Sequence, residues 1–113
     1  MSKTNQVQLI GNLGQQPSLI TSDTGKLLTS FSMATKDHYK NDKGEKVEST
    51  EWHNIVVFGK LAQIICNHTQ KGSKVLIQGK LQTRQYQTKE GENKYRTEII
   101  ANEVLFLDNK TNN

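Results

Sequence analysis

The stretch EWHNIVVFGKLAQIICNHTQKG, residues 51–72, joins a strand pattern directly to a helical pattern. In its first part, the aliphatic side chains of Ile55 and Val57 occupy alternate positions, which is typical of a strand with one buried face. From residue 61 onward, Leu61, Ile64, Ile65 and His68 stand at positions one, four, five and eight, a spacing that is typical of one face of a helix. No other part of the chain has this helical spacing. The sequence therefore predicts a strand-rich chain with one short helix near its middle.

Four further stretches have the residue types and the turn boundaries of strands. They are VQLIGNL (7–13), LLTSFSMAT (27–35), SKVLIQGKLQTRQY (73–86) and KYRTEIIANEVLFL (94–107). The order along the chain is thus three strands, one helix and two strands. This order is typical of an all-β, five-stranded Greek-key barrel of the OB type, with a short α-helix between strands 3 and 4. Other small β-barrels share the same order and remain alternatives.

Details of these stretches give more specific expectations. Gly11, inside the first strand, predicts a bulge or a close approach of another backbone. The polar residues 36–50 predict an exposed hairpin or flap around an Asp-Lys-Gly turn. The fourth strand has the clearest alternation, and its predicted core face is formed by Val75, Ile77, Gly79 and Leu81.

The composition fits one small domain. The chain has 113 residues, of which 33% are hydrophobic, so we expect a barrel domain over residues 1–107 and a short polar tail over residues 108–113. The formal net charge of +4 favours a polyanionic partner without deciding the matter. The sequence shows neither a signal peptide nor an apolar run long enough to cross a membrane. These features predict a cytoplasmic protein.

Metal binding and catalysis find little support in the sequence. Cys66 is the only cysteine, so an intrachain disulfide is excluded and a thiolate zinc site is not favoured. The three histidines do not have the spacing of a metal motif. No Ser-His-Asp signature and no phosphate-binding glycine loop is present. We therefore expect a protein without metal, without cofactor and without enzymatic activity.

The outer faces of the third and fourth strands combine aromatic rings with cations. On the side away from the predicted core, the third strand carries Trp52 and Phe58, and the fourth carries Lys80, Arg84 and Tyr86. Leaving such rings exposed is unfavourable, because burying each is worth about 1.5–3 kcal/mol. A second protein subunit or a nucleobase could cover them. Rings and cations together suit a nucleic-acid single strand, whose bases stack while Lys or Arg meets its phosphates. A solvated polar face, and a core position for Trp52, are the alternatives.

Four motifs in succession then carry a family resemblance. They are NLGQQP (12–17), STEWHNIVVFGKLAQI (49–64), KGSKVLIQGKLQTRQY (71–86) and KYRTEI (94–99). Together they resemble the bacterial single-stranded DNA-binding protein (SSB) family, from about Asn5 to Leu107. The resemblance implies an OB-fold barrel that binds and protects single-stranded DNA, without sequence preference, during replication, recombination and repair. It also implies a homotetramer, a dimer of dimers, that is associated with the nucleoid.

The same resemblance implies roles for particular residues. Base stacking would fall to Trp52, Phe58 and Tyr86, and in the flap to Tyr39, where many family members have tryptophan. Phosphate contacts would fall to basic positions along the DNA path: Arg84, Lys60 and Lys71, and more loosely Lys36, Lys40 and Lys43. The outer face of the fourth strand adds Lys80 to this set. Subunit contacts would fall to His53, and we add Val7 and Leu9 of the first strand.

The last residues depart from the family pattern. Family members usually continue into a linker rich in Gly, Pro and Gln and end in an acidic, Phe-terminated tip that recruits replication and repair proteins. This sequence ends with LFLDNKTNN. We therefore expect DNA coating, and we do not expect recruitment through such a tip. A phage, plasmid or otherwise specialised member would fit, as would a truncated chain. A primosome-type protein-interaction module and an RNA-binding barrel are the alternative functions.

Overall fold

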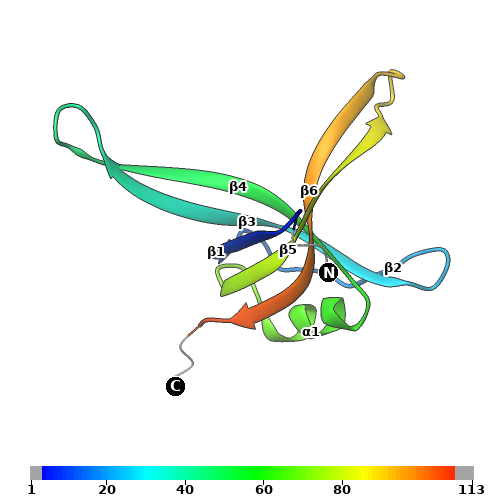
Figure 1. Ribbon diagram of the computed structural model, residues 1–113. Coiled ribbons are helices and arrows are strands. Elements are labelled where there is room, and N and C mark those ends of the chain that lie inside the picture. Colours follow the sequence, from blue (N-terminus) through cyan, green and yellow to red (C-terminus); the bar gives the residue numbers. More distant parts are fainter. Residues whose placement is uncertain (1–3, 109–113) are drawn as a thin grey trace.

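A computed structural model describes residues 4–108 of the chain (Figure 1). Within these residues, the elements follow in the order β1 (Val7–Leu13), β2 (Ile20–Thr21), β3 (Leu27–Lys40), β4 (Lys46–Phe58), α1 (Lys60–His68), β5 (Lys74–Gln87) and β6 (Asn93–Phe106). Apart from residue 108, the predicted polar tail lies outside the described residues. The first three residues of the predicted domain lie outside them as well.

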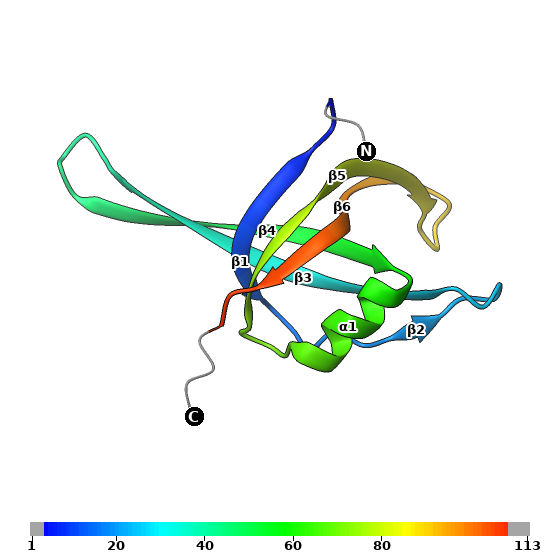
Figure 2. The same ribbon diagram turned by 60° about the horizontal axis from the view of Figure 1, so that its bottom comes forward.

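Five of these strands close into a barrel (Figure 2). Neighbours in the sheet follow the order β1-β5-β6-β4-β3, and β1 returns to β3 through Asn12 and Leu13. β4 and β6 run parallel over residues 55–57 and 99–101, whereas the other pairs are antiparallel. The short β2 pairs with the first two residues of β3 and is not one of the five barrel strands. The predicted five-stranded barrel of the OB type is confirmed, and β2 is an addition to it.

The hydrophobic core fills the barrel and continues beneath α1. Its largest fully buried side chains are Met33, Ile55, Ile65, Ile77, Val57 and Val75. α1 starts two residues after β4 and packs Ala62 and Ile65 into this core. Seen in Figure 1, the helix lies across the lower end of the barrel. The one helix among the described residues therefore occupies the predicted place, between the third and fourth predicted strands, which are β4 and β5.

Two glycines allow backbones to approach closely where the barrel closes. A Cβ atom at Gly11 would overlap the carbonyl oxygen of Ala34, at the point where β1 meets β3. A Cβ atom at Gly79 would overlap the carbonyl oxygen of Ile100 on the neighbouring strand β6. The close approach predicted at Gly11 is confirmed. Side chains at these two positions would force the strands apart.

One predicted core residue is wrong. Leu81 follows the alternation of β5 but is 47% exposed, whereas Val75 and Ile77 are buried. The register between β5 and β6 shifts at Gln78 and Gly79. β1 pairs with β5 only as far as Gly79, so Leu81 lies just beyond the last position that β1 covers, and further on β5 and β6 continue as a two-stranded arm (Figure 1).

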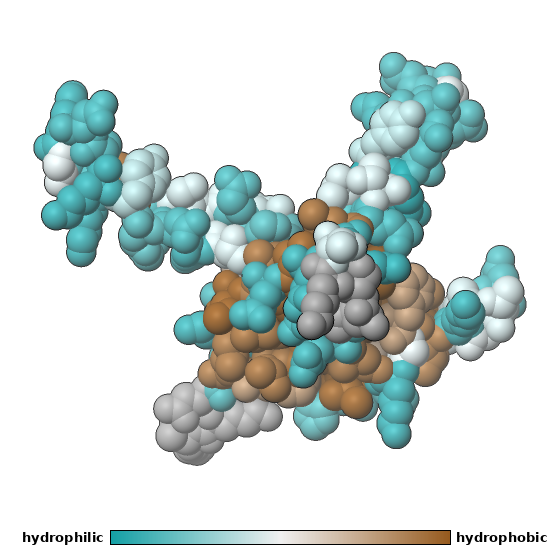
Figure 3. All heavy atoms as spheres, viewed as in Figure 1, coloured by the Kyte–Doolittle hydropathy of each residue, from teal (hydrophilic) through white to brown (hydrophobic). Residues whose placement is uncertain are grey.

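Two hairpins project from the barrel as long arms (Figure 1). The predicted flap is one of them: β3 and β4 remain paired out to Lys40 and Lys46, and the side-chain oxygen of Asn41 accepts hydrogen bonds from the backbone N–H groups of Lys43 and Glu45 in the turn. The other arm is formed by β5 and β6. Figure 3 shows that both arms are largely hydrophilic, while apolar residues gather on the barrel. Within residues 4–108, the helix is too short and too polar to cross a membrane.

Candidate nucleic-acid interface

The outer face of β4 carries the two rings that the alternation placed there. Trp52 is 61% exposed and Phe58 is 50% exposed, whereas Ile55 and Val57 between them are fully buried. Phe58 follows Trp52 by six positions, which corresponds to about 20 Å of strand. The prediction that Trp52 and Phe58 lie outside the barrel is therefore confirmed, and a core position for Trp52 is excluded.

Trp52 lies against the end of β1. Its register partner on β3 is Ala34, and its ring passes close to Gly14, which follows β1 directly. A Cβ atom at Gly14 would come within 2.6 Å of Cζ3 of the ring and within 2.7 Å of the hydroxyl oxygen of Ser32. The ring is thus supported from one side, because glycine leaves room for it, while most of its surface remains open to a ligand.

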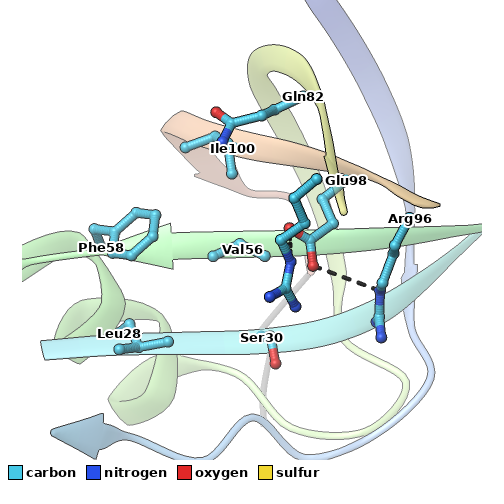
Figure 4. A pocket seen from close by; sticks show the side chains of 9 residues that line it. Leu28, Ser30, Val56, Phe58, Gln82, Arg96, Glu98 and Ile100 are labelled. Carbon is cyan, nitrogen blue, oxygen red and sulfur yellow. Dashed lines mark hydrogen bonds and ion pairs between the residues drawn. The ribbon is translucent and has the colours of Figure 1, made fainter. Parts of the chain in front are cut away.

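Phe58 forms one end of a groove that crosses β3, β4, β6 and β5. The groove has a volume of about 350 Å³. Leu28 and Val56 continue its apolar end, and Arg84 and Arg96 line its other end. Figure 4 shows Val56 between Phe58 and the charged groups. An aromatic surface and two cations therefore share one open concavity on the outer face of the barrel.

The charged end of this groove is organised by one buried carboxylate. Glu98 on β6 is only 5% exposed. Its Oε1 accepts a hydrogen bond from Nε of Arg84 at 3.1 Å, and its Oε2 forms an ion pair with Nε of Arg96 at 3.5 Å (Figure 4). The side chains of Arg84 and Arg96 remain 57% and 45% exposed. Both guanidinium groups are therefore fixed at one nitrogen and accessible elsewhere.

The outer arm of β5 extends the same face. Tyr86 is 41% exposed and follows Arg84 by two residues, so the two side chains lie on one side of the strand. Lys80 is also exposed, and its register partner Ile100 lines the groove. By the same alternation, Tyr95 of β6 lies on the opposite side of the arm, where it is 70% exposed.

The predicted lysines are spread around the barrel. Lys60 begins α1, two residues after Phe58, next to the apolar end of the groove. Lys71 is exposed in the turn whose Gly72 N–H donates to the carbonyl oxygen of Leu13, close to the end of β1. Lys36 lines a second groove, of about 330 Å³, together with Lys74. Cations therefore lie beyond both ends of the outer face of β4.

The remaining predicted contacts lie on the β3–β4 arm. Tyr39 is 54% exposed and is paired with Val47 far from the barrel. Lys40 is at the end of β3, and Lys43 is in the turn. Tyr39 follows Lys36 by three positions along β3, so the two side chains lie on opposite faces of the hairpin. The structure therefore does not bring Tyr39, Lys40 and Lys43 together with Phe58 and Arg84.

The predicted subunit-contact residues are mostly engaged within the chain. Val7 and Leu9 are partly buried and pack against the hydrophobic core. His53 is half-buried, and its Nε2 is hydrogen-bonded to the hydroxyl of Thr35 at 2.9 Å. The outward positions of β1 are instead taken by side chains such as Ile10, which is 48% exposed.

Two features of this interface were missed at the sequence level. Arg96 and its buried partner Glu98 were not predicted, although β6 alternates so that both share a face with Ile100. Lys74, beside Lys36, was also missed. The alternation of β6 could have identified Arg96, since the outer face of its partner strand β5 was already known. Among residues 4–108, no group of three His, Cys, Asp or Glu side chains is placed to hold a metal ion.

Comparison with known proteins matches this arrangement to one family. The sequence pattern of the single-strand binding protein family matches residues 4–107. A protein of Xylella fastidiosa, single-stranded DNA-binding protein 1, is 42% identical over all of this chain and 84% of its own length. The single-stranded DNA-binding protein of Neisseria meningitidis is 38% identical over 96% of this chain, which spans 63% of that relative.

Solved structures give the same result for the fold. A Plasmodium falciparum SSB in complex with ssDNA superposes with a TM-score of 0.86 and 32% identity, over 96% of this chain and 98% of that one. A deletion mutant of the single-stranded DNA binding protein from Thermus aquaticus gives a TM-score of 0.82 at 24% identity, over 94% of this chain and 51% of that one. With the family pattern covering nearly every described residue, the chain belongs to the single-strand binding protein family.

Proposed function

We propose that this protein binds single-stranded DNA without sequence preference, and so coats and protects it during replication, recombination and repair. The observation that carries the proposal is the outer face of β4, where Trp52 and Phe58 are exposed and the groove at Phe58 also holds Arg84. The names of the Xylella and Neisseria relatives, and the DNA in the Plasmodium complex, support it. The protein would then be found with the DNA of the nucleoid.

Physical chemistry explains why such a face prefers a single strand. In proteins of this kind, each base stacked on an aromatic side chain contributes about 1–3 kcal/mol, whatever the base. Duplex DNA keeps its base faces stacked on one another, so exposed rings have nothing to bind there. Arginine and lysine along the path neutralise phosphates and release counterions, which makes binding depend on salt. Each barrel would cover about 4–16 nucleotides.

We also propose that the chain assembles as a homotetramer, a dimer of dimers. β1 pairs with β5 over residues 7–12 but with β3 only at Asn12 and Leu13, so part of its other edge is open for another strand. Ile10 and Leu105 are 48% and 51% exposed, and Leu76 lies between them in register. The contact would therefore use the β1 edge and this apolar outer face, while Val7 and Leu9 stay in the core.

The test is a comparison of labelled oligo(dT) with a duplex of the same length, read by fluorescence anisotropy at several salt concentrations. We expect tight binding of oligo(dT) and weak binding of the duplex. The logarithm of the oligo(dT) binding constant should fall linearly with the logarithm of the salt concentration, with a slope of about −0.7 for each phosphate neutralised. Equal affinity for both, or no dependence on salt, would contradict the proposal. Oligonucleotide recovered intact after incubation with Mg²⁺ is expected from a protein that binds without catalysis. Light scattering with and without oligo(dT) reports the subunit number.

A further inference from the structure

We propose that Arg84, Glu98 and Arg96 form one preorganised site for the phosphodiester backbone of single-stranded DNA, in which Glu98 is the positioning residue. The proposal rests on the function proposed above and goes beyond it in two respects. It assigns a DNA contact to Arg96, and it assigns to a negatively charged residue a favourable role in binding a polyanion.

The burial of Glu98 is the first observation. A carboxylate that is only 5% exposed must be paired, because removing an ion from water is strongly unfavourable. Each of its oxygens has a guanidinium partner of its own: Nε of Arg84 lies 3.1 Å from Oε1, and Nε of Arg96 lies 3.5 Å from Oε2. One carboxylate therefore restrains two long side chains that would otherwise sample many rotamers.

The register of the arm is the second observation. Arg84 and Arg96 are direct partners across β5 and β6, and like charges in such positions repel each other. Glu98 is opposite Gln82, two pairs closer to the barrel, and its carboxylate reaches both arginines. The carboxylate thus offsets the repulsion and leaves a site with a net charge of about +1 that still presents two cations.

The accessible ends of the arginines are the third observation. Both contacts with Glu98 use Nε, and no interaction of the terminal amino groups with another described residue is found. These side chains are 57% and 45% exposed and open into the groove that Phe58 closes at its other end. Planar guanidinium groups held in this way can donate paired hydrogen bonds to phosphate oxygens.

The decisive variant is Glu98→Gln, because two explanations predict opposite signs for it. If Glu98 only contributes a negative charge near the DNA, its removal tightens binding. If it positions the arginines, its removal weakens binding of labelled oligo(dT) by about tenfold, since one or both charge-assisted hydrogen bonds are lost. The control Glu90→Gln removes the same charge from the exposed turn of the same arm. Its affinity should stay equal to that of the wild type or rise about twofold.

The salt dependence gives a readout that a merely structural role would not change. Arg96→Ala should lower the logarithmic salt slope for oligo(dT) by about 0.7. Glu98→Gln should also lower the slope, although it makes the chain more positive. A folded Glu98→Gln variant that binds as tightly as the wild type, or more tightly, would overturn the inference.

A further pair of variants covers the case in which Glu98→Gln does not fold. Arg84→Lys and Arg96→Lys keep the charge and remove the planar fork, so each should bind oligo(dT) several-fold more weakly. Unchanged affinity in both would overturn the inference as well. Failure of the wild type itself to bind oligo(dT) would instead reject the proposed function, so the two failures are distinguishable.

Discussion

Replacing Trp52 by alanine should separate DNA binding from stability. The ring is 61% exposed, so of the roughly 250 Å² of a large aromatic side chain it buries only about 100 Å². At about 25 cal/mol per Å², the loss in the free energy of unfolding is at most about 2.5 kcal/mol. The loss in binding should be that of one stacked base, about 1–3 kcal/mol, or about 5- to 150-fold in affinity.

The assay is the anisotropy of labelled oligo(dT) with Trp52→Ala, Trp52→Phe and the wild type, after circular dichroism has shown that each is folded. Trp52→Phe keeps a ring for stacking and should lose less affinity than the alanine variant. Tyr95→Ala is the matched control, because it removes a ring that is 70% exposed on the opposite side of the β5–β6 arm. Its affinity should change less than twofold.

Two results would refute this reasoning. If Trp52→Ala bound oligo(dT) as tightly as the wild type, the exposed ring of β4 would not be a stacking site. If Tyr95→Ala lost as much affinity as Trp52→Ala, binding would not be confined to the face that carries Phe58 and Arg84. Either result would leave the fold intact and would require a different path for the DNA.

Three further substitutions test the packing beneath the interface. Thr29→Val should leave the free energy of unfolding unchanged or raise it by about 1 kcal/mol, because the fully buried hydroxyl of Thr29 has no hydrogen-bond partner among residues 4–108. A clear loss of stability in chemical denaturation would contradict this. Gly11→Ala should lower the free energy of unfolding by about 3 kcal/mol, because the new Cβ overlaps the carbonyl of Ala34. A loss below about 0.5 kcal/mol would mean that β1 and β3 can move apart at little cost. Gly14→Ala should displace the ring of Trp52 with little loss of stability, shifting its emission and weakening oligo(dT) binding; an unchanged spectrum would show that the ring does not rest there.

The alternation along β4 was sufficient to predict which aromatic rings are exposed on its outer face. Ile55 and Val57 are strongly apolar and lie two residues apart, so only one orientation of the strand buries both. That orientation turns Trp52 and Phe58 outward, as the structure has them. The single helical pattern after β4 likewise predicted the one helix and its place between the third and fourth predicted strands. These predictions succeeded because they depend on local periodicity alone.

The features that escaped prediction depend on where the barrel ends and on contacts between strands. Leu81 lies on the same side of β5 as the core residues, but β1 pairs with β5 only as far as Gly79, so the side chain of Leu81 stays exposed. Alternation predicts the side of a strand and not where the neighbouring strand ends. Glu98 is a charged residue in a buried position, which local patterns place at the surface. Only its contacts with Arg84 of the neighbouring strand β5 and with Arg96 of its own strand explain it.

The exposed face of β4 is tested most directly by the emission of Trp52, the only tryptophan of the chain, during titration with oligo(dT). Because the ring is open to solvent beside Gly14, a base that stacks on it should quench its fluorescence substantially, in a saturable manner, and high salt should reverse the change. A duplex of the same length should leave the emission nearly unchanged. An emission that stays constant while anisotropy shows the labelled oligo(dT) to be fully bound would contradict the account.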